Sequence, residues 1–327
     1  MNVRKIARRR VLILGSVILV ILIVISSSYL TGAYFVDFAL RRGNPQDPYA
    51  PPPAAAEIAD KNLKIPPAPD FPCEDWTVAA LDGLKLKAVH YKPKQNTHNW
   101  AILIHGYARD GRYAHHYADQ YLKQGFEVLL PDLRASGRSE GHYLTMGVSE
   151  SLDLAQWEKL ILERDPDAEI VLHGVSMGAS TALLAAGFAG LKSLKAVIAD
   201  CGYSDVRELF TKELKALFGL PAFPVIDIFD VVCHLKIGIS IMSPTPLTAA
   251  AASDVPVLFF HGDRDTLVPP GMMADLYAAS RAKLKRQVLV TGAGHAGAMG
   301  ADYQAYFRTV FAFIAEALAQ ERPENIP

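Results

Sequence analysis

A serine stands between an apolar run and a stretch of small residues in residues 169–187. Residues 170–172 are Ile-Val-Leu, which is typical of a buried strand. Gly174 and Gly178 lie two positions before and two positions after Ser176, and residues 179–186 are rich in Ala and Leu, which favours a closely packed helix. The sequence therefore predicts a strand, a sharp turn and a helix, with the Ser176 hydroxyl presented at the carboxyl end of the strand.

The same glycine and serine spacing occurs a second time, in residues 137–141. A strained turn such as the one predicted at Ser176 needs glycine at positions where a Cβ atom would collide with the backbone. The helix that follows this turn presents its N-terminus to the serine, which favours the negative charge that develops there during a reaction. Ser139 has neither a strand directly before it nor an apolar helix after it, so we interpret residues 137–141 as a polar loop. Ser176 is therefore the candidate nucleophile.

The overall composition narrows the class of protein. The chain has 327 residues, 50% of them hydrophobic, and a net charge of −1, which is enough for one large or two ordinary domains with a proper core. The near-zero charge argues against a nucleic-acid partner. The three cysteines, Cys73, Cys201 and Cys233, show no metal-binding spacing. We expect buried free thiols, the alternative being one disulfide.

The N-terminal segment has the composition of a membrane anchor. Residues 1–10 contain five basic residues and no acid, and residues 11–36 contain no charged residue, which is long enough to span a bilayer. The excess of positive charge before the run predicts a cytoplasmic N-terminus and an extracytoplasmic remainder. No small-residue cleavage site follows the run, so we favour an uncleaved signal-anchor over a cleaved signal peptide.

A linker and a folded domain are expected to follow the anchor. Residues 43–72 contain nine prolines, so we predict an extended Pro/Ala-rich linker over residues 37–72 and a domain over residues 73–327.

Strand and helix patterns alternate through that domain. The expected strands are residues 77–80, 84–90, 100–104, 126–130, 170–172, 196–199, 255–260 and 287–290, and the expected helices are residues 114–124, 149–164, 179–186, 272–281 and 303–319. This alternation predicts an α/β fold with a mostly parallel sheet of about eight strands and helices on both faces.

Residues 204–250 interrupt the alternation with apolar helical pieces and several prolines. We interpret them as a small helical lid that lies over the serine and shapes the substrate pocket. The alternative is a helical layer with no role in the pocket.

A serine hydroxyl needs a base, and ten histidines are available. His295 lies in a loop of small residues after the last expected strand, where an imidazole can reach inward. His115 and His116 are expected to be solvated helix residues. His105 and His261 lie at strand ends before glycine and are expected to support loops.

The base needs an orienting acid and the intermediate needs hydrogen-bond donors. Asp265, in the acidic loop after the expected strand of residues 255–260, is the preferred acid. Asp263 can instead pair with Arg264 or cap the turn, and Asp200 is a third candidate. The order Ser176, Asp265, His295 is the one expected when these groups stand at the ends of successive parallel strands. The backbone N–H groups of Met177 and Tyr107 are the expected oxyanion donors.

These motifs resemble one known family. Residues from about 75 to 320 are similar to the α/β-hydrolase superfamily, and in particular to membrane-anchored bacterial esterases and lipases and to the catalytic domains of prolyl-oligopeptidase-like enzymes. The resemblance is carried by residues 104–107, 130–134, 137–141, the Ser176 turn, residues 261–269 and Gly294-His295. It implies a cofactor-free serine esterase, lipase or peptidase in which Asp132 and Arg134 are structural.

The expected function is that of a carboxylesterase. The substrate would be a small-molecule or lipid-like ester with an apolar acyl or aromatic group, cleaved through an acyl-enzyme, with no cofactor and no metal. A peptidase or amidase using the same three residues is the alternative among enzymes. An inert hydrolase fold serving as a membrane-bound binding protein is the alternative from another class. The sequence predicts no oligomeric state.

Overall fold

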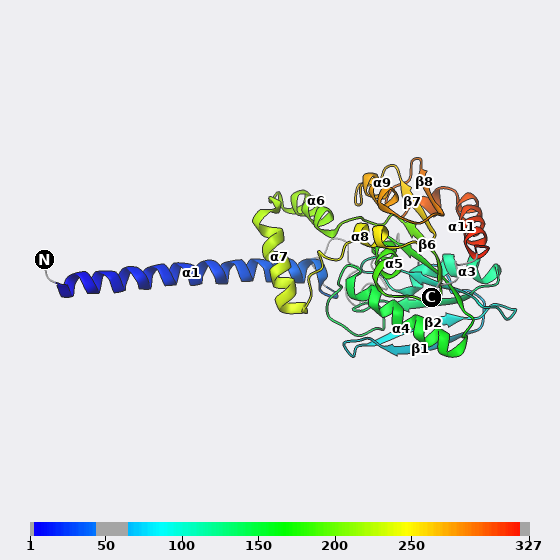
Figure 1. Ribbon diagram of the computed structural model, residues 1–327, viewed down its shortest axis with the longest axis horizontal. Coiled ribbons are helices and arrows are strands. Elements are labelled where there is room, and N and C mark those ends of the chain that lie inside the picture. Colours follow the sequence, from blue (N-terminus) through cyan, green and yellow to red (C-terminus); the bar gives the residue numbers. More distant parts are fainter. Residues whose placement is uncertain (1–2, 44–64, 321–327) are drawn as a thin grey trace, which may run out of the picture. The chain divides into compact units, whose positions relative to one another are not determined.

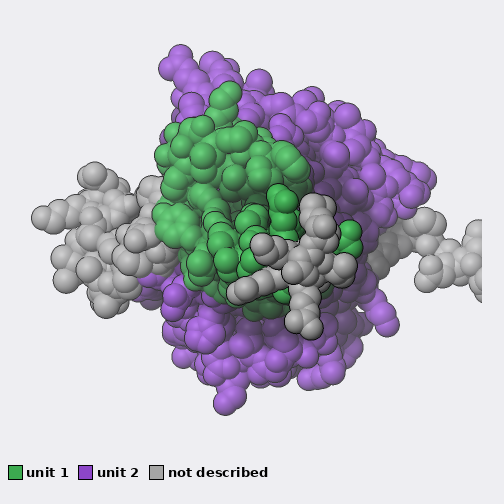
Figure 2. Space-filling view, turned by 90° about the vertical axis from the view of Figure 1, so that its left-hand side faces the viewer, with its two compact units in different colours: residues 1–39, 210–240 green, residues 40–209, 241–327 purple. Residues whose placement is uncertain are grey.

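The computed structural model describes residues 3–43 and 65–320, and the chain divides into two compact units. The sheet unit comprises Leu40–Leu209 and Ile241–Pro327, and the helical unit comprises Met1–Ala39 and Phe210–Ser240 (Figure 2). Most of the predicted linker, residues 44–64, lies outside the described residues.

The sheet unit is built on an eight-stranded sheet with the order β1-β2-β4-β3-β5-β6-β7-β8 (Figure 1). The pairs β1–β2 and β2–β4 are antiparallel, and every other pair is parallel. The mostly parallel sheet expected from the sequence is therefore confirmed. The strands are β1 Cys73–Ala79, β2 Lys85–Tyr91, β3 Asn99–Ile104, β4 Glu127–Asp132, β5 Glu169–Val175, β6 Leu194–Asp200, β7 Val257–Gly262 and β8 Lys285–Val290.

Helices cover both faces of this sheet. On one face, α3 and α11 share a hydrophobic core with alternate strand residues such as Leu103, Ile198 and Phe260. On the other, α4, α5, α8 and α9 contact one another in that order. The helices of this unit are η1 Gly111–Ala114, α3 His115–Lys123, α4 Val148–Arg164, α5 Met177–Phe188, α8 Pro246–Ala252, α9 Pro270–Ala279, α10 Ala298–Ala301 and α11 Tyr303–Leu318.

The strand order reverses direction beside β3. From β3 the chain runs to β4 on one side, and β5 then pairs with the other side of β3, with Ile104 opposite Gly174. In open α/β sheets, the crevice outside the carboxyl ends of the strands at such a switch point is where ligands bind. The loop after β3 and the Ser176 turn after β5 meet at this point.

The helical unit consists of most of α1 Val3–Leu40, most of α6 Val206–Phe218, and α7 Ala222–Ile237. Among the described residues, α1 is the single continuous helix long and apolar enough to cross a membrane, over Arg9–Leu40. This helix contains residues 11–36, the uncharged run from which the sequence predicted a membrane-spanning segment.

The predicted lid, residues 204–250, is divided between the two units. Residues 210–240 belong to the helical unit, whereas α8 belongs to the sheet unit and contacts α5. A Cβ atom at Gly187 would lie 2.7 Å from the Ala249 Cα atom, so the absence of a side chain at Gly187 lets the two helices approach. That residues 210–240 cover the serine stays a prediction.

Two local expectations are wrong. His115 is buried and its Nδ1 atom lies 3.0 Å from the Pro66 carbonyl oxygen, whereas His116 is exposed as expected. All three thiols are free and Cys201 and Cys233 are buried, as expected, but Cys73 is exposed in the edge strand β1. Within α4, Asp153 forms a buried ion pair with Arg134, and Glu150 is the acidic residue of the first turn.

Candidate active site

Ser176 occupies a strained turn between β5 and α5. Its φ of 56° and ψ of −120° lie outside the conformations that a residue with a side chain ordinarily adopts. Its N–H donates to the Asp200 carbonyl oxygen at 2.8 Å, which ties the turn to the end of the neighbouring strand β6. The serine is therefore held in one orientation by both strands.

The two glycines beside Ser176 are required by close contacts. A Cβ atom at Gly174 would lie 2.1 Å from the Gly178 carbonyl oxygen, and one at Gly178 would lie 2.1 Å from the Ile104 carbonyl oxygen. Both distances are far shorter than any real contact, so a side chain at either position would displace the backbone. This is the reason for the glycine spacing from which the sequence predicted the turn.

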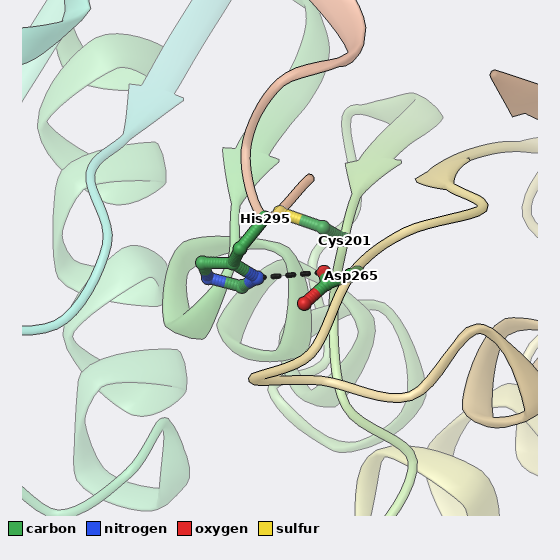
Figure 3. A group of neighbouring side chains, drawn as sticks. All are labelled: Cys201, Asp265 and His295. Carbon is green, nitrogen blue, oxygen red and sulfur yellow. Dashed lines mark hydrogen bonds and ion pairs between the residues drawn. The ribbon is translucent and has the colours of Figure 1, made fainter. Parts of the chain in front are cut away.

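The structure brings His295 and Asp265 together with Ser176. The Nε2 atom of His295 lies 2.8 Å from the Ser176 Oγ atom. The Nδ1 atom of His295 lies 2.7 Å from the Asp265 Oδ2 atom, and Figure 3 shows this contact between the loop after β8 and the loop after β7. Each distance is within normal hydrogen-bond range, so one continuous chain of hydrogen bonds runs from carboxylate to hydroxyl.

Asp265 is held by contacts on both of its oxygens. Its Oδ1 atom accepts hydrogen bonds from the N–H groups of Leu267 at 3.0 Å and Val268 at 2.9 Å. Its Oδ2 atom also lies 3.2 Å from the Nε2 atom of His261. Burial opposes ionisation, but the contacts with His261, His295 and the Val268 N–H outweigh it and hold the pKa of Asp265 well below its usual range. The carboxylate is therefore ionised and fixed in orientation.

The two other candidate acids have different partners. Asp263 accepts a hydrogen bond from the Gly292 N–H at 2.6 Å and so caps a turn. Asp200 is fully buried at the end of β6 and accepts a hydrogen bond from the Tyr306 hydroxyl at 2.9 Å. Burial raises the pKa of Asp200 to about 6. Of the three acids, the geometry favours Asp265 as the partner of His295.

The predicted oxyanion donors lie on the two loops that meet at the strand-order reversal. Met177 is the first residue of α5, so its N–H is one of those at a helix start that have no partner within the helix. Tyr107 follows Gly106, where a Cβ atom would lie 3.5 Å from the Ser176 Cβ atom. The loop after β3 thus passes directly beside the serine, and the donor role of the two N–H groups stays a prediction.

Cys201 is a neighbour of the site that the sequence did not single out. Its sulfur, an Asp265 oxygen and a His295 nitrogen lie within 4.8 Å of one another (Figure 3). Metal binding requires a thiolate, and burial raises the pKa of this thiol well above its usual value. The Asp265 Oδ1 atom already accepts hydrogen bonds from two backbone N–H groups, and the Oδ2 atom already contacts His295 and His261. The donor set therefore suits an acid–base pair beside a neutral thiol better than a metal centre. The clue in the sequence was that Cys201 directly follows the β6 strand.

The second glycine-serine-glycine segment is structural, as expected. The Ser139 hydroxyl is buried, donates to the Asp132 carbonyl oxygen at 2.5 Å and accepts from the Lys87 N–H at 2.8 Å. The Asp132 side chain accepts hydrogen bonds from the N–H groups of Gly111 and Arg138. These contacts fix the loop that follows β4.

The histidines expected to support loops do so. His105 accepts a hydrogen bond from the Leu133 N–H at its Nε2 atom, at 3.0 Å. His261 contacts the Val268 carbonyl oxygen through its Nε2 atom at 2.9 Å, within the loop that carries Asp265. Both histidines therefore fix loops at the carboxyl edge of the sheet.

Comparison with known proteins identifies relatives of this chain. A model of the family described as serine aminopeptidase, S33, matches residues 95–220. The uncharacterized protein YqkD of Bacillus subtilis is 30% identical over 240 residues, covering 73% of this chain and 78% of its own. The uncharacterized membrane protein YNL320W of Saccharomyces cerevisiae is 26% identical over 226 residues, covering 69% of this chain and 74% of its own.

Solved structures share the architecture as well. The esterase Pf2001 of Pyrococcus furiosus superposes with a TM-score of 0.62 at 24% identity, over 75% of this chain and 91% of its own. At this identity the likeness concerns the fold. The sheet order, the serine turn after β5 and the relatives agree: the chain belongs to the α/β-hydrolase superfamily.

Proposed function

We propose that the protein is a serine hydrolase of carboxylic esters, with Ser176 as nucleophile, His295 as general base and Asp265 as the acid that orients the base. The observation that carries the proposal is the chain of hydrogen bonds from Asp265 through His295 to Ser176, at 2.7 and 2.8 Å, ending on a serine held at positive φ. This arrangement supports nucleophilic attack, because a serine hydroxyl at neutral pH needs an adjacent base.

The reaction would proceed in two steps. His295 takes the Ser176 proton while Oγ attacks the acyl carbon, and then gives that proton to the leaving alcohol. An acyl-enzyme remains, and a water molecule activated by His295 releases the acid. The N–H groups of Met177 and Tyr107 would stabilise the oxyanion, and each such donor contributes about 3 kcal/mol to lowering the barrier.

The same geometry can cleave an amide. The matching family model is described as a serine aminopeptidase, which favours testing amide substrates beside esters. Faster turnover of aminoacyl anilides than of p-nitrophenyl esters would select the peptidase or amidase.

Membrane anchoring through α1 is part of the proposal. It is supported by the length and apolar character of Arg9–Leu40 and by a relative whose name describes a membrane protein. The basic residues before the apolar run favour a cytoplasmic N-terminus and an extracytoplasmic sheet unit.

The first test is labelling of the full chain in detergent with a fluorophosphonate probe, followed by mapping of the modified peptide. We expect stoichiometric labelling at Ser176 that is lost in Ser176→Ala and His295→Ala. The matched control is Ser139→Ala, which changes the other serine of the same spacing and should keep the label. A folded protein that takes no label would contradict the proposal and favour an inert binding protein.

A further inference from the structure

The apolar part of α1 ends at a definite depth. At 1.5 Å per residue, the helix from Val11 to Gly32 is about 30 Å long, the thickness of a bilayer core. Arg9 and Arg10 precede it, and the exposed side chains of Tyr29 and Tyr34 flank Gly32. Tyrosine is enriched where a membrane meets water. With Arg10 at one interface between membrane and water, Gly32 lies at the opposite interface.

Helix α7 crosses α1 (Figure 1), and the crossing lies at Gly32. A Cβ atom at Gly32 would lie 2.6 Å from the Val232 Cγ2 atom and 2.9 Å from the Ile228 Cγ2 atom, so the glycine permits the crossing. One turn further along α1, the Asp37 Oδ1 atom pairs with the Lys236 Nζ atom at 2.6 Å. The crossing is thus fixed by an apolar contact and an ion pair.

Helix α6 is attached to the same end of α1. The Phe218 ring lies edge-on to Phe35 and to Phe38, with centroids 5.2 and 5.3 Å apart. Because α6 and α7 meet at a break of a few residues and are bent by 117°, their corner is held beside the point where the apolar run ends.

This corner, residues 215–224, exposes apolar side chains. Phe223 is 78% exposed, and Leu217, Phe218 and Leu220 are also exposed. Residues 215–226 contain one lysine and no acidic residue. Exposed apolar side chains grouped beside a cation are typical of a surface that lies in the headgroup and acyl boundary of a membrane, and the flanking acids Glu213 and Asp227 lie outside this segment.

We propose that the corner of α6 and α7 is a lipid-binding surface that inserts into the interface of the bilayer crossed by α1. This surface contacts the part of the lipid acyl chains that lies next to the headgroups, and Lys215 lies near the headgroup phosphates. This inference rests on the proposed function, because it makes esters carried by membrane lipids the substrate class of the Ser176 site.

The depth of the corner can be measured in the full chain reconstituted into phosphatidylcholine vesicles. Phe223→Trp places a tryptophan on the corner. The matched control is Leu81→Trp, because Leu81 is 74% exposed in the sheet unit, in the turn between β1 and β2. The three native tryptophans are Trp76, Trp100 and Trp157, all buried in the sheet unit, and their emission is subtracted with the unsubstituted protein.

We expect lipids brominated near the carbonyl end of their acyl chains to quench the tryptophan at position 223 and to leave the control unquenched. No quenching at position 223 overturns the proposal. Stronger quenching by lipids brominated near the chain ends overturns it as well, and identifies a re-entrant helix pair deep in the bilayer.

Activity gives a second, independent readout. Phe223→Ser should lower hydrolysis of a long-chain 4-methylumbelliferyl ester embedded in the vesicles, relative to a water-soluble acetyl ester, by about tenfold, because one buried aromatic side chain is removed from the lipid. Leu81→Ser should leave this ratio unchanged, and an unchanged ratio in Phe223→Ser contradicts the substrate class. Absence of acetyl-ester hydrolysis in the unsubstituted protein would instead refute the proposed function, whatever the quenching shows.

Discussion

Asp265 uses its two oxygens for two different tasks. The Oδ1 atom accepts hydrogen bonds from the N–H groups of Leu267 and Val268, and the Oδ2 atom accepts a hydrogen bond from His295. The backbone contacts orient the carboxylate, and the contact with His295 fixes which nitrogen of the ring carries the proton. The Nε2 atom, which faces Ser176, is then the free base.

Asp265→Asn tests this division. An amide keeps one oxygen for the backbone N–H groups and turns its NH2 toward the His295 Nδ1 atom, so that Nε2 carries the proton and cannot accept one from Ser176. We expect kcat/KM for a p-nitrophenyl ester to fall by about a thousandfold to ten-thousandfold, mostly in kcat. Steady-state kinetics measure it, and Asp263→Asn, two residues away, should cost less than about tenfold. A larger loss in Asp263→Asn would reverse the assignment of the acid.

A second buried carboxyl ends a line of hydrogen bonds behind the site. The Tyr306 hydroxyl donates to the Asp200 Oδ2 atom and lies 3.0 Å from the His173 Nε2 atom, and the Tyr121 hydroxyl lies 3.0 Å from His173 Nδ1. Since the Tyr306 proton goes to Asp200, His173 must donate from Nε2 and accept at Nδ1. The other Asp200 oxygen, Oδ1, has no hydrogen-bond partner among the described residues.

Asp200→Asn should therefore change how stability depends on pH. Burial raises the pKa of Asp200 from 3.8 to about 6, so between these values the folded protein holds a proton that the unfolded chain has lost. The free energy of unfolding of the native protein then falls as pH rises through this window, by about 2–3 kcal/mol from this group. The asparagine at position 200 of the variant does not titrate, so the variant does not lose this part of its free energy of unfolding as pH rises.

The measurement is the difference in the free energy of unfolding between the variant and the native protein, from denaturant titrations between about pH 4 and pH 7. The difference should shift in favour of the variant as pH rises. Burial lowers the pKa of His173 to about 3, but this group is present in both proteins and cancels in the difference. A difference that is constant with pH would contradict the prediction.

The contact between α1 and α7 depends on one residue without a side chain. Gly32 faces Val232 and Ile228, whereas a Cβ atom at Gly15, in the same helix, would meet nothing within 4 Å. The two glycines therefore form a matched pair: both lie in the apolar run, and only one lies at a crossing.

Gly32→Leu should separate α7 from α1, because overpacking of this kind costs about 1–3 kcal/mol. We expect trypsin to cleave the chain after Lys215 about tenfold faster in this variant, since local opening governs cleavage in folded proteins. Gly15→Leu is the control and should be cleaved at the native rate. Equal rates in the two variants would show that the crossing does not hold α6 and α7.

The sequence predicts what depends on local pattern. Every strand of the sheet was expected within a few residues, because the central strands are short apolar runs bounded by turn residues and β2 alternates apolar with polar residues. The Ser176 turn was predictable from two glycines, and the positions of Asp265 and His295 from their order along parallel strands. The turn depends on residues that are neighbours in the sequence, and the positions of Asp265 and His295 depend on the order of the strands along the chain.

Contacts between distant segments were not predictable. Lys236 and Asp37 are 199 positions apart, and nothing in either segment indicates the other. His115 was expected in solvent because a helix pattern does not reveal that Pro66 covers it. Cys201 has no motif, and only the strand order brings its sulfur beside Asp265 and His295.

At the scale of the whole molecule, α1 begins in the helical unit and ends at Leu40, the first residue of the sheet unit. Within the sheet unit, the Arg42 N–H donates to the His142 carbonyl oxygen and the Leu144 N–H donates to the Leu40 carbonyl oxygen. The Arg42 guanidinium also donates to the Ser139 carbonyl oxygen at 2.7 Å. Under the proposed anchoring, chain connectivity alone therefore puts the sheet unit on the side of the membrane on which α1 ends.

The exposed thiol of Cys73 can report that side. Cys201 and Cys233 are buried, so a membrane-impermeant maleimide should react with Cys73 in the native chain. The five basic residues before the apolar run favour a cytoplasmic N-terminus. We therefore expect labelling of mildly reduced, intact spheroplasts, and loss of that labelling in Cys73→Ser.

The same chain provides the opposite control. Asn2→Cys combined with Cys73→Ser carries its thiol before the apolar run and should be labelled in inverted vesicles but not in intact spheroplasts. Labelling of Cys73 only after the membrane is broken would place the sheet unit in the cytoplasm. The positive charges near the N-terminus would then not have set the orientation, and Ser176 would act on esters of the inner leaflet.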